Sequence, residues 1–186
     1  VGTDIPVVGV NLGRLGFLTA IPDIHLEEGL EKVVSGDAVI EHRFRLQARI
    51  EIEGLITGEE FYALNDVVVH TTGAARVTPL TLSIGAPASR VDEDGYDLDG
   101  MEEVGSFAAD GVIISTPTGS TAYSMSAGGP IIVPEVEAIV VTPICPHSLA
   151  VRPLVVPAHA TLRVGSLDPD SDHHLTVDGQ VVYKLE

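Results

Sequence analysis

The sequence predicts a β-rich (α+β) protein. Many short apolar segments are separated by Gly, Pro or acidic turns, one segment alternates between apolar and polar residues, and only one stretch has clear helical spacing. The chain has 186 residues, which suits one domain with a sizeable core. Hydrophobic residues make up 45% of it and charged residues 20%, as in a folded globular protein.

The first elements differ from the rest. Residues 5–10 form a short apolar run that leads into glycines 13 and 16, which predicts a buried strand entering a tight turn. This looks like the end of an α/β unit. Residues 24–35 carry apolar side chains at positions 26, 30, 33 and 34, which predicts a helix, and Asp23 is a candidate cap.

Strand signals begin near residue 43. Alternation over residues 43–53 places Phe44, Leu46, Ala48, Ile50 and Ile52 on one face of a half-buried strand. Further strands are predicted over residues 61–70 (interrupted at 65–66), 80–84, 112–114, 139–141, 154–156, 162–164 and 177–183.

Residues 91–103 contain seven acidic side chains in thirteen positions and predict an exposed hairpin tip. A calcium loop is the alternative. It is disfavoured because a loop starting at Asp92 places Tyr96 where a ligand is needed and Asp97 where the invariant glycine belongs.

The charge balance excludes some partners. Ten Lys and Arg against twenty-seven Asp and Glu give a net charge of −17, which repels a nucleic-acid backbone. Two explanations of this excess of acidic residues stay open: adaptation to high salt, or a compositional bias of the source genome. No apolar run reaches the ~20 residues of a membrane span, and the start has no basic region typical of a secretion signal. The single cysteine, Cys145, indicates a reducing, cytoplasmic location.

The segment richest in chemistry is residues 110–130. A predicted strand runs into a loop of small hydroxyl residues around Gly119, and either Ser120 or Thr121 is a candidate helix cap. The free N–H groups of such a helix would bind an anion without Lys or Arg. The alternative is an ordinary Ser/Thr-rich turn, and residue types alone leave both open. The loop is neither a Walker loop nor a hydrolase nucleophile elbow.

Residues 110–123 resemble the Asp-Gly-x-x-x-Ser-Thr-Pro-Thr-Gly-Ser-Thr-Ala-Tyr motif of the NAD kinases (ATP or polyphosphate NAD kinases). Residues 9–18, 64–66, 142–149, 152–153 and 178–180 resemble other blocks of that family in the same order. The resemblance implies a distorted β-sandwich of the NAD kinase C-terminal type over residues 23–186, preceded by the end of an N-terminal α/β nucleotide-binding domain in residues 1–22.

The resemblance also implies an activity. The family transfers phosphate from ATP or polyphosphate, with Mg²⁺, to the adenosine 2′-hydroxyl of NAD, and it forms homodimers or homotetramers. The family's Gly-Gly-Asp-Gly-Thr motif, whose aspartate is regarded as the catalytic base, is absent from this sequence. We therefore expect the catalytic aspartate upstream of this chain, and the chain alone to be inactive.

Roles follow residue by residue from the resemblance. Asn65 and Asp66 would contact the ribose and nicotinamide side of NAD; here Asp66 replaces the family's Glu. Asp110 and Tyr123 would lie where a neighbouring subunit completes the site. The remaining implied contacts are Thr121, Ala122 and Ser126 to adenine and ribose, Thr118 nearby, Gly16 and Phe17 close to a nucleotide ring, and Arg76 and Gln180 as secondary contacts. Ala108 stands where a basic residue is common, and the acidic insert is longer than usual.

Two other functions stay open at this point. One is a nucleotide-binding module without turnover, favoured by the missing aspartate motif. The other is a related lipid or sphingoid kinase, against which Asn65-Asp66 and the Thr121-Ala122-Tyr123 run favour a dinucleotide. No metal site is expected, because the adjacent His173 and His174 point to opposite faces of a strand. His147, in a proline-rich turn, is interpreted as structural rather than as an acid or base.

Overall fold

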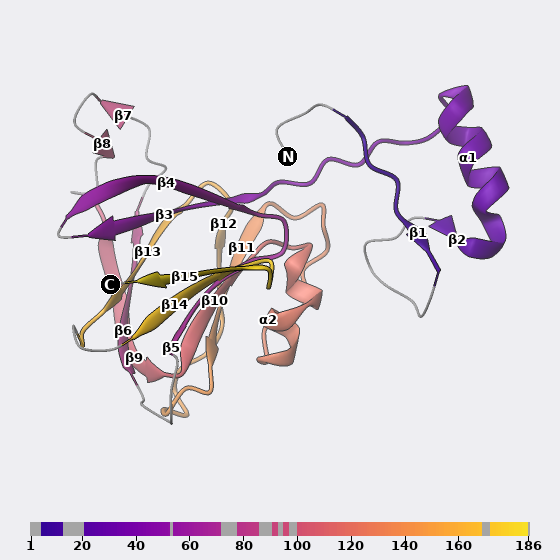
Figure 1. Ribbon diagram of the computed structural model, residues 1–186. Coiled ribbons are helices and arrows are strands. Elements are labelled where there is room, and N and C mark those ends of the chain that lie inside the picture. The colour runs from indigo at the N-terminus through magenta and orange to yellow at the C-terminus, as the bar shows by residue number, and fades with distance from the viewer. Residues whose placement is uncertain are drawn as a thin grey trace. The chain divides into compact units, whose positions relative to one another are not determined.

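The computed structural model describes residues 5–12, 21–52, 54–71, 78–85, 91–92, 95–96, 100–168 and 172–185. The chain divides into two compact units, Val1–Arg43 and Phe44–Glu186, and each is described by itself (Figure 1). The domain boundary expected after residue 22 stays a prediction. None of the helices in the described part of the chain is long and apolar enough to span a bilayer.

The first unit pairs two short strands and carries the one long helix. Strands β1 (Val10–Asn11) and β2 (Ile21–Pro22) are parallel. A 3-10 turn, η1 (Asp23–His25), leads into helix α1 (Leu26–Ser35), which ends at Gly36 with a φ of 81°. The helix is thus confirmed, but Asp23 as its cap is wrong: His25 occupies the N-cap position of α1, and Pro22 occupies that of the preceding turn. The Asp23 carboxylate accepts only from the next N–H, that of Ile24, at 2.8 Å.

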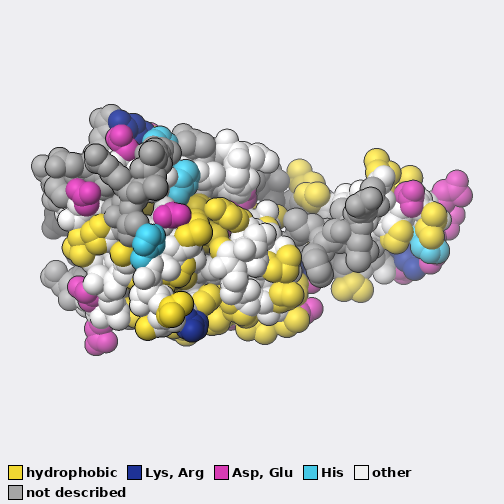
Figure 2. All heavy atoms as spheres, turned by 90° about the horizontal axis from the view of Figure 1, so that it is seen from below, with side chains coloured by type: hydrophobic (Ala, Val, Ile, Leu, Met, Phe, Trp, Pro, Cys, Tyr) yellow, Lys and Arg dark blue, Asp and Glu magenta, His cyan; other side chains and the backbone are white. Residues whose placement is uncertain are grey.

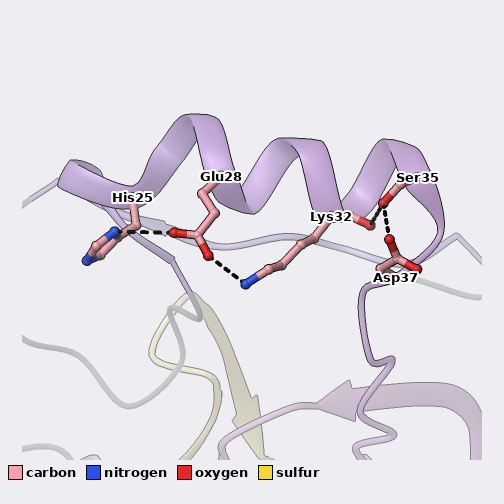
Figure 3. A network of polar contacts seen from close by, with 5 residues as sticks. All are labelled: His25, Glu28, Lys32, Ser35 and Asp37. Atoms are coloured by element: carbon pink, nitrogen blue, oxygen red, sulfur yellow. Dashed lines mark hydrogen bonds and ion pairs between the residues drawn. The ribbon is translucent and has the colours of Figure 1, made fainter.

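The exposed face of α1 is held by a short polar network (Figure 3). Glu28 lies between His25, 3.7 Å away, and Lys32, 2.7 Å away. Both pairs have helical spacing, and Lys32 and His25 lower the pKa of the exposed Glu28 carboxyl, with the hydrogen bond from Lys32 as the largest cause. The Ser35 hydroxyl donates to Asp37 at 2.8 Å, just beyond the helix.

The second unit is built on a six-stranded antiparallel sheet in the order β12-β11-β10-β5-β14-β15. Its strands are β5 (Asp66–Thr71), β10 (Gly111–Ser115), β11 (Ala138–Ile144), β12 (Leu154–Pro157), β14 (His173–Val177) and β15 (Val181–Leu185). A second sheet has the order β13-β6-β9, with β6 (Thr78–Gly85), β9 (Glu102–Ala109) and β13 (Thr161–Ser166). The second unit also contains two separate hairpins: β3 (Leu46–Ile52) with β4 (Leu55–Ala63), and β7 (Val91–Asp92) with β8 (Gly95–Tyr96).

The β-rich fold class is confirmed, and most strands lie where the sequence predicts them. The predicted interruption at residues 65–66 is a bend at Leu64 and Asn65, which separates β4 from β5. The acidic segment lies between β6 and β9, which pair antiparallel, and Glu102 and Glu103 belong to β9 itself. Residues 93–94 and 97–99 fall outside the described residues, so the exposed hairpin tip stays a prediction.

Two strand predictions are wrong. Residues 5–10 are not a buried strand: only Val10–Asn11 forms a strand there, and Ile5 and Val7 are 71% and 91% exposed.

Residues 177–183 are not a single strand. They contain the end of β14, a turn and the start of β15, because Asp178 and Gly179 adopt left-handed φ values of 48° and 66°. The chain therefore reverses between β14 and β15. This turn becomes important at the site.

The two faces of the six-stranded sheet differ. Val67, Leu175 and Val177 alternate onto one face and pack in the core with side chains of β3, β4 and β12. Asp66, Val68 and His70 lie on the opposite face of β5, since successive strand residues alternate. On that face the 3-10 turn η2 (Gly119–Thr121) and the short helix α2 (Tyr123–Ser126) follow β10 (Figure 1). A buried 2.8 Å hydrogen bond between the Ser124 and Thr142 hydroxyls joins α2 to β11.

Candidate functional site

A cavity of about 550 Å³ opens beside the polar face of the sheet. Its walls come from β5, from the ends of β11 and β14, from the residues just before β5 and β10, from the turn after β14, and from the start of α2. The lining residues are Asn65, Asp66, Val68, His70, Thr71, Asp110, Ala122, Tyr123, Ile144, Thr176, Asp178 and Gly179.

The centre of the wall is a junction of two turns. Asn65 lies in the bend before β5, and Asp178 lies in the turn after β14. Because β5 and β14 pair antiparallel, with Val67 opposite Val177, the bend and the turn meet at the same end of the sheet.

The Asp178 carboxylate joins these two turns. It accepts hydrogen bonds from three successive backbone N–H groups, of Leu64 at 2.8 Å, Asn65 at 2.7 Å and Asp66 at 3.0 Å. The Asp178 N–H in turn donates to the Asp66 carbonyl at 2.9 Å. Hydrogen bonds to a charged acceptor are stronger than neutral ones. The backbone under Asn65 and Asp66 is therefore fixed from one side.

The hydroxyl-rich loop fixes the same backbone from the other side. The Thr116 N–H donates to the Asn65 carbonyl at 2.9 Å, and the Thr116 hydroxyl donates to the Leu64 carbonyl at 2.6 Å. Gly119 packs so closely that a Cβ there would lie 2.0 Å from the Asn65 carbonyl oxygen. Only glycine fits at this approach.

The helix cap predicted at Ser120 or Thr121 is wrong, and anion binding by this loop stays a prediction. Thr116 and Ser120 are fully buried, and the Ser120 hydroxyl donates to the Pro117 carbonyl at 2.6 Å and accepts from the Ile132 N–H at 3.0 Å. Neither η2 nor α2 begins at a side-chain cap, and α2 has four residues. The hydroxyls of Thr116 and Ser120 stabilise the loop, as in an ordinary Ser/Thr-rich turn.

The cavity is acidic. Three of its described lining side chains are carboxylates, Asp66, Asp110 and Asp178, and none of the described residues that line it is Lys or Arg. Figure 2 shows the same balance on one face of the molecule, where histidine and acidic side chains lie beside hydrophobic ones and Lys or Arg are sparse. Such a cavity offers acceptors to a ligand rich in hydroxyl groups.

Asp66 has an unusual protonation equilibrium. Its side chain is 5% exposed, and this burial is the larger cause that raises its pKa to about 6. The charge of Asp178 adds to the effect. Asp66 is therefore ionised at neutral pH and becomes protonated in mild acid.

Asp110 and His70 complete the polar wall. The Asp110 backbone is used by neighbouring strands, because its N–H donates to the Ile144 carbonyl at 3.0 Å and its carbonyl accepts from the Thr71 N–H at 3.1 Å. Its half-buried carboxylate lines the cavity. His70 Nδ1 donates to the Thr71 carbonyl at 3.3 Å, and Nε2 lies 3.2 Å from the Thr176 hydroxyl.

The structure brings five of the predicted residues together at the cavity: Asn65, Asp66, Asp110, Ala122 and Tyr123. Four others lie outside its lining: Thr118 is buried, Thr121 donates its hydroxyl to the Thr118 carbonyl at 3.3 Å, and Ser126 and Gln180 are exposed. Gly16, Phe17 and Arg76 fall outside the described residues. The NAD-binding roles of all of them stay predictions.

Sequence analysis did not assign a role to Asp178, His70 or Thr176. His70 follows Asp66 by four positions on one strand, so the two-residue period already placed it on the same face. Asp178 was visible only as part of the 178–180 block. Among the described residues, no group of three or more His, Cys, Asp or Glu side chains is placed to hold a metal ion.

The chain is similar to known kinases. Residues 64–186 match the family model of the ATP-NAD kinase C-terminal domain. The NAD kinase of Gemmatimonas aurantiaca is 45% identical over 97% of this chain and 57% of its own length. The NAD kinase of Heliobacterium modesticaldum is 45% identical over 95% of this chain and 56% of its own length. The chain thus spans a little over half the length of these curated relatives.

Solved structures agree in fold. Yeast NADH kinase, determined with NADH, superposes with a TM-score of 0.78 at 34% identity, over 97% of this chain and 47% of that one. An NAD kinase from Archaeoglobus fulgidus, determined with ATP, superposes with a TM-score of 0.74 at 28% identity, over 97% of this chain and 62% of that one.

Proposed function

This chain belongs to the NAD kinase family, and we propose that it forms the NAD-binding part of an enzyme that phosphorylates the adenosine 2′-hydroxyl of NAD. The observation that carries the proposal is the convergence of Asn65, Asp66 and Tyr123 on one cavity lined by carboxylates. A dinucleotide presents ribose hydroxyls, which are donors, and such a wall supplies acceptors for them.

Positioning is the chemistry that this chain would contribute. The Asn65 amide and the ionised Asp66 carboxylate accept hydrogen bonds from ribose hydroxyls, and Tyr123 packs against a ring of the dinucleotide. Phosphoryl transfer depends mainly on such alignment and on charge stabilisation. The donor would be ATP or polyphosphate supplied with Mg²⁺, whose charge would offset that of the phosphates. No residue of this chain is assigned as the base.

A nucleotide-binding module without turnover is the second candidate. The observation that favours it is that none of the described residues lining the cavity is assigned as the base. The two candidates share the binding site and differ in whether NADP forms. A lipid or sphingoid substrate is disfavoured, because the relatives that this chain matches are NAD kinases.

Asp66→Asn should weaken NAD binding and stabilise the fold. A ribose hydroxyl loses a charged acceptor worth ~1.5–3 kcal/mol, so the dissociation constant rises roughly tenfold to a hundredfold. The raised pKa of about 6 means that the folded state takes up a proton more readily than the unfolded chain. The buried charge therefore costs stability above pH 6, and this cost disappears below about pH 4. The variant should melt higher at pH 8.

The pH dependence of binding checks the same assignment. If ionised Asp66 is the acceptor, wild-type affinity should fall about tenfold between pH 7.5 and pH 5, because the carboxylate becomes protonated. Isothermal titration with NAD measures both effects, and Asp66→Asn should lack this pH dependence. Equal affinities of the two proteins at pH 7.5 would contradict the role of Asp66. Asn65→Ala should weaken binding in a similar way.

We also propose a homodimer or homotetramer. Tyr123, Met125, Ile131 and Val133 are between 42% and 60% exposed on α2 and the segment after it. Exposed apolar side chains grouped in this way are typical of interaction surfaces. Light scattering at high micromolar concentration in moderate salt should give at least the mass of a dimer, and a strictly monomeric mass would count against this assembly.

The remaining proposals concern the cellular compartment and the binding partners. A reducing, cytoplasmic compartment is consistent with one cysteine, Cys145, in the whole sequence. The net charge of −17 argues against nucleic acid as a partner. The partners proposed are NAD and ATP or polyphosphate.

A further inference from the structure

The Asn65–Asp66 pair is held by a residue from the far end of the chain. Asp178 lies 113 positions after Asn65, and no local spacing links them. The contact forms because β14 pairs with β5, which brings the turn after one strand to the bend before the other.

The contact is specific to a carboxylate. One oxygen, Oδ1, accepts from both Asn65 and Asp66, and the other, Oδ2, accepts from Leu64. All three partners are donors, so both side-chain oxygens are acceptors at once. An amide in this place would direct its NH₂ group at an N–H, and one side of the contact would be lost.

The backbone of the turn also suits an aspartate. Asp178 adopts a left-handed φ of 48°, which Asp and Asn tolerate better than other non-glycine residues. Its N–H returns a bond to the Asp66 carbonyl. The turn and the bend are therefore tied in both directions.

We propose that Asp178 is a positioning residue for NAD: its carboxylate, by accepting the three N–H groups of residues 64–66, sets where the Asn65 and Asp66 side chains stand in the cavity. This inference rests on the proposed function of that cavity. The same carboxylate lies beside Asp66, and its charge contributes to the raised pKa of Asp66. Asp178 thus affects both the place of the acceptor and the pH at which it is ionised.

Asp178→Asn is the test variant. Asparagine keeps the size and the tolerance for a left-handed φ, so the turn should form. The variant should bind NAD at least ~tenfold more weakly, because two acceptor side chains lose their support. The pH midpoint of NAD binding should move to lower pH, because the negative charge beside Asp66 is gone.

Asp172→Asn is the matched control. Asp172 precedes β14 on the same hairpin, is exposed, and pairs with Lys184 at 3.2 Å rather than with the bend. It loses the same charge outside the cavity lining. Its NAD affinity and pH midpoint should equal those of the wild type.

The experiment is isothermal titration of NAD into wild type, Asp178→Asn and Asp172→Asn from pH 5 to pH 8. If wild type does not bind NAD at any pH, the proposed function and this inference both fail. If wild type binds and Asp178→Asn has the same affinity and midpoint, the proposed function stands and the inference alone is overturned.

A measurement on the wild type covers the case in which Asp178→Asn does not fold. The amide protons of Leu64, Asn65 and Asp66 should exchange slowly with solvent and become further protected by at least ~tenfold when NAD saturates the cavity. Exchange of these three amides that NAD leaves unchanged would overturn the inference, since the bend would then not be part of the NAD site.

Discussion

Residues 1–186 alone, given NAD, ATP and magnesium, should form NADP at least ~10²–10⁴-fold more slowly than a protein that also carries the Gly-Gly-Asp-Gly-Thr motif. A positioned base contributes a factor of that size. The glycine-rich loop would also orient the triphosphate, and its loss adds to the deficit. The cavity supplies acceptor-side residues, Asn65, Asp66, Asp110 and Tyr123, but none of these is assigned to remove the 2′-hydroxyl proton.

A chimera provides the comparison. The motif-bearing segment of the Gemmatimonas aurantiaca relative, placed before this chain, should restore NADP formation. Asp66→Asn in the chimera should lower turnover at limiting NAD without removing the base. Robust turnover by residues 1–186 would mean that the base lies within this chain, and Asp110 or Asp66 would then be the leading candidate.

Gly119→Ala should destabilise the fold by about 3 kcal/mol, at the upper end of the usual cost of overpacking. A Cβ at this position would lie 2.0, 2.4 and 2.6 Å from the oxygen, carbon and Cα of Asn65. These are backbone atoms, so no flexible side chain can move aside. The loop must separate from the bend, and NAD binding should be lost along with stability because Asn65 is displaced.

Gly58→Ala is the matched control for this substitution. Gly58 lies in the exposed part of β4, and a Cβ there would meet nothing within 4 Å. We expect its effect to stay within about 0.5 kcal/mol. Urea denaturation and NAD titration of both variants give the comparison. Wild-type stability of Gly119→Ala would show that the loop and the bend are not packed as described.

The sequence predicts the strands well where the period is clear. Residues 43–53 alternate without exception, and β3 forms within them because one face must be buried. The same criterion fails at residues 177–183. Apolar Val177 and Val181 flank Asp178, so the segment looks continuous, and only the left-handed φ of Asp178 and Gly179 reveals the turn.

The residues of the candidate site were likewise only partly predictable from the sequence. Motif resemblance identifies Asn65, Asp66 and Tyr123 because the information is local. It assigns no role to Asp178, whose partners are more than 110 positions away and are backbone groups without a residue signature. The helix cap predicted in the hydroxyl-rich loop is wrong for a related reason. Thr116 and Ser120 bind carbonyls and an N–H that only the folded chain brings within reach.

The most direct test of the central claim is to map NAD binding onto the chain by amide chemical-shift perturbation. NAD added to ¹⁵N-labelled residues 1–186 should give saturable shifts concentrated at residues 65–66, 110, 122–123 and 178–179, which surround the cavity. The method detects the weak binding expected without the upstream motif. Saturable shifts that avoid these positions, or no saturable shifts at millimolar NAD, would contradict the claim that this cavity is the NAD site.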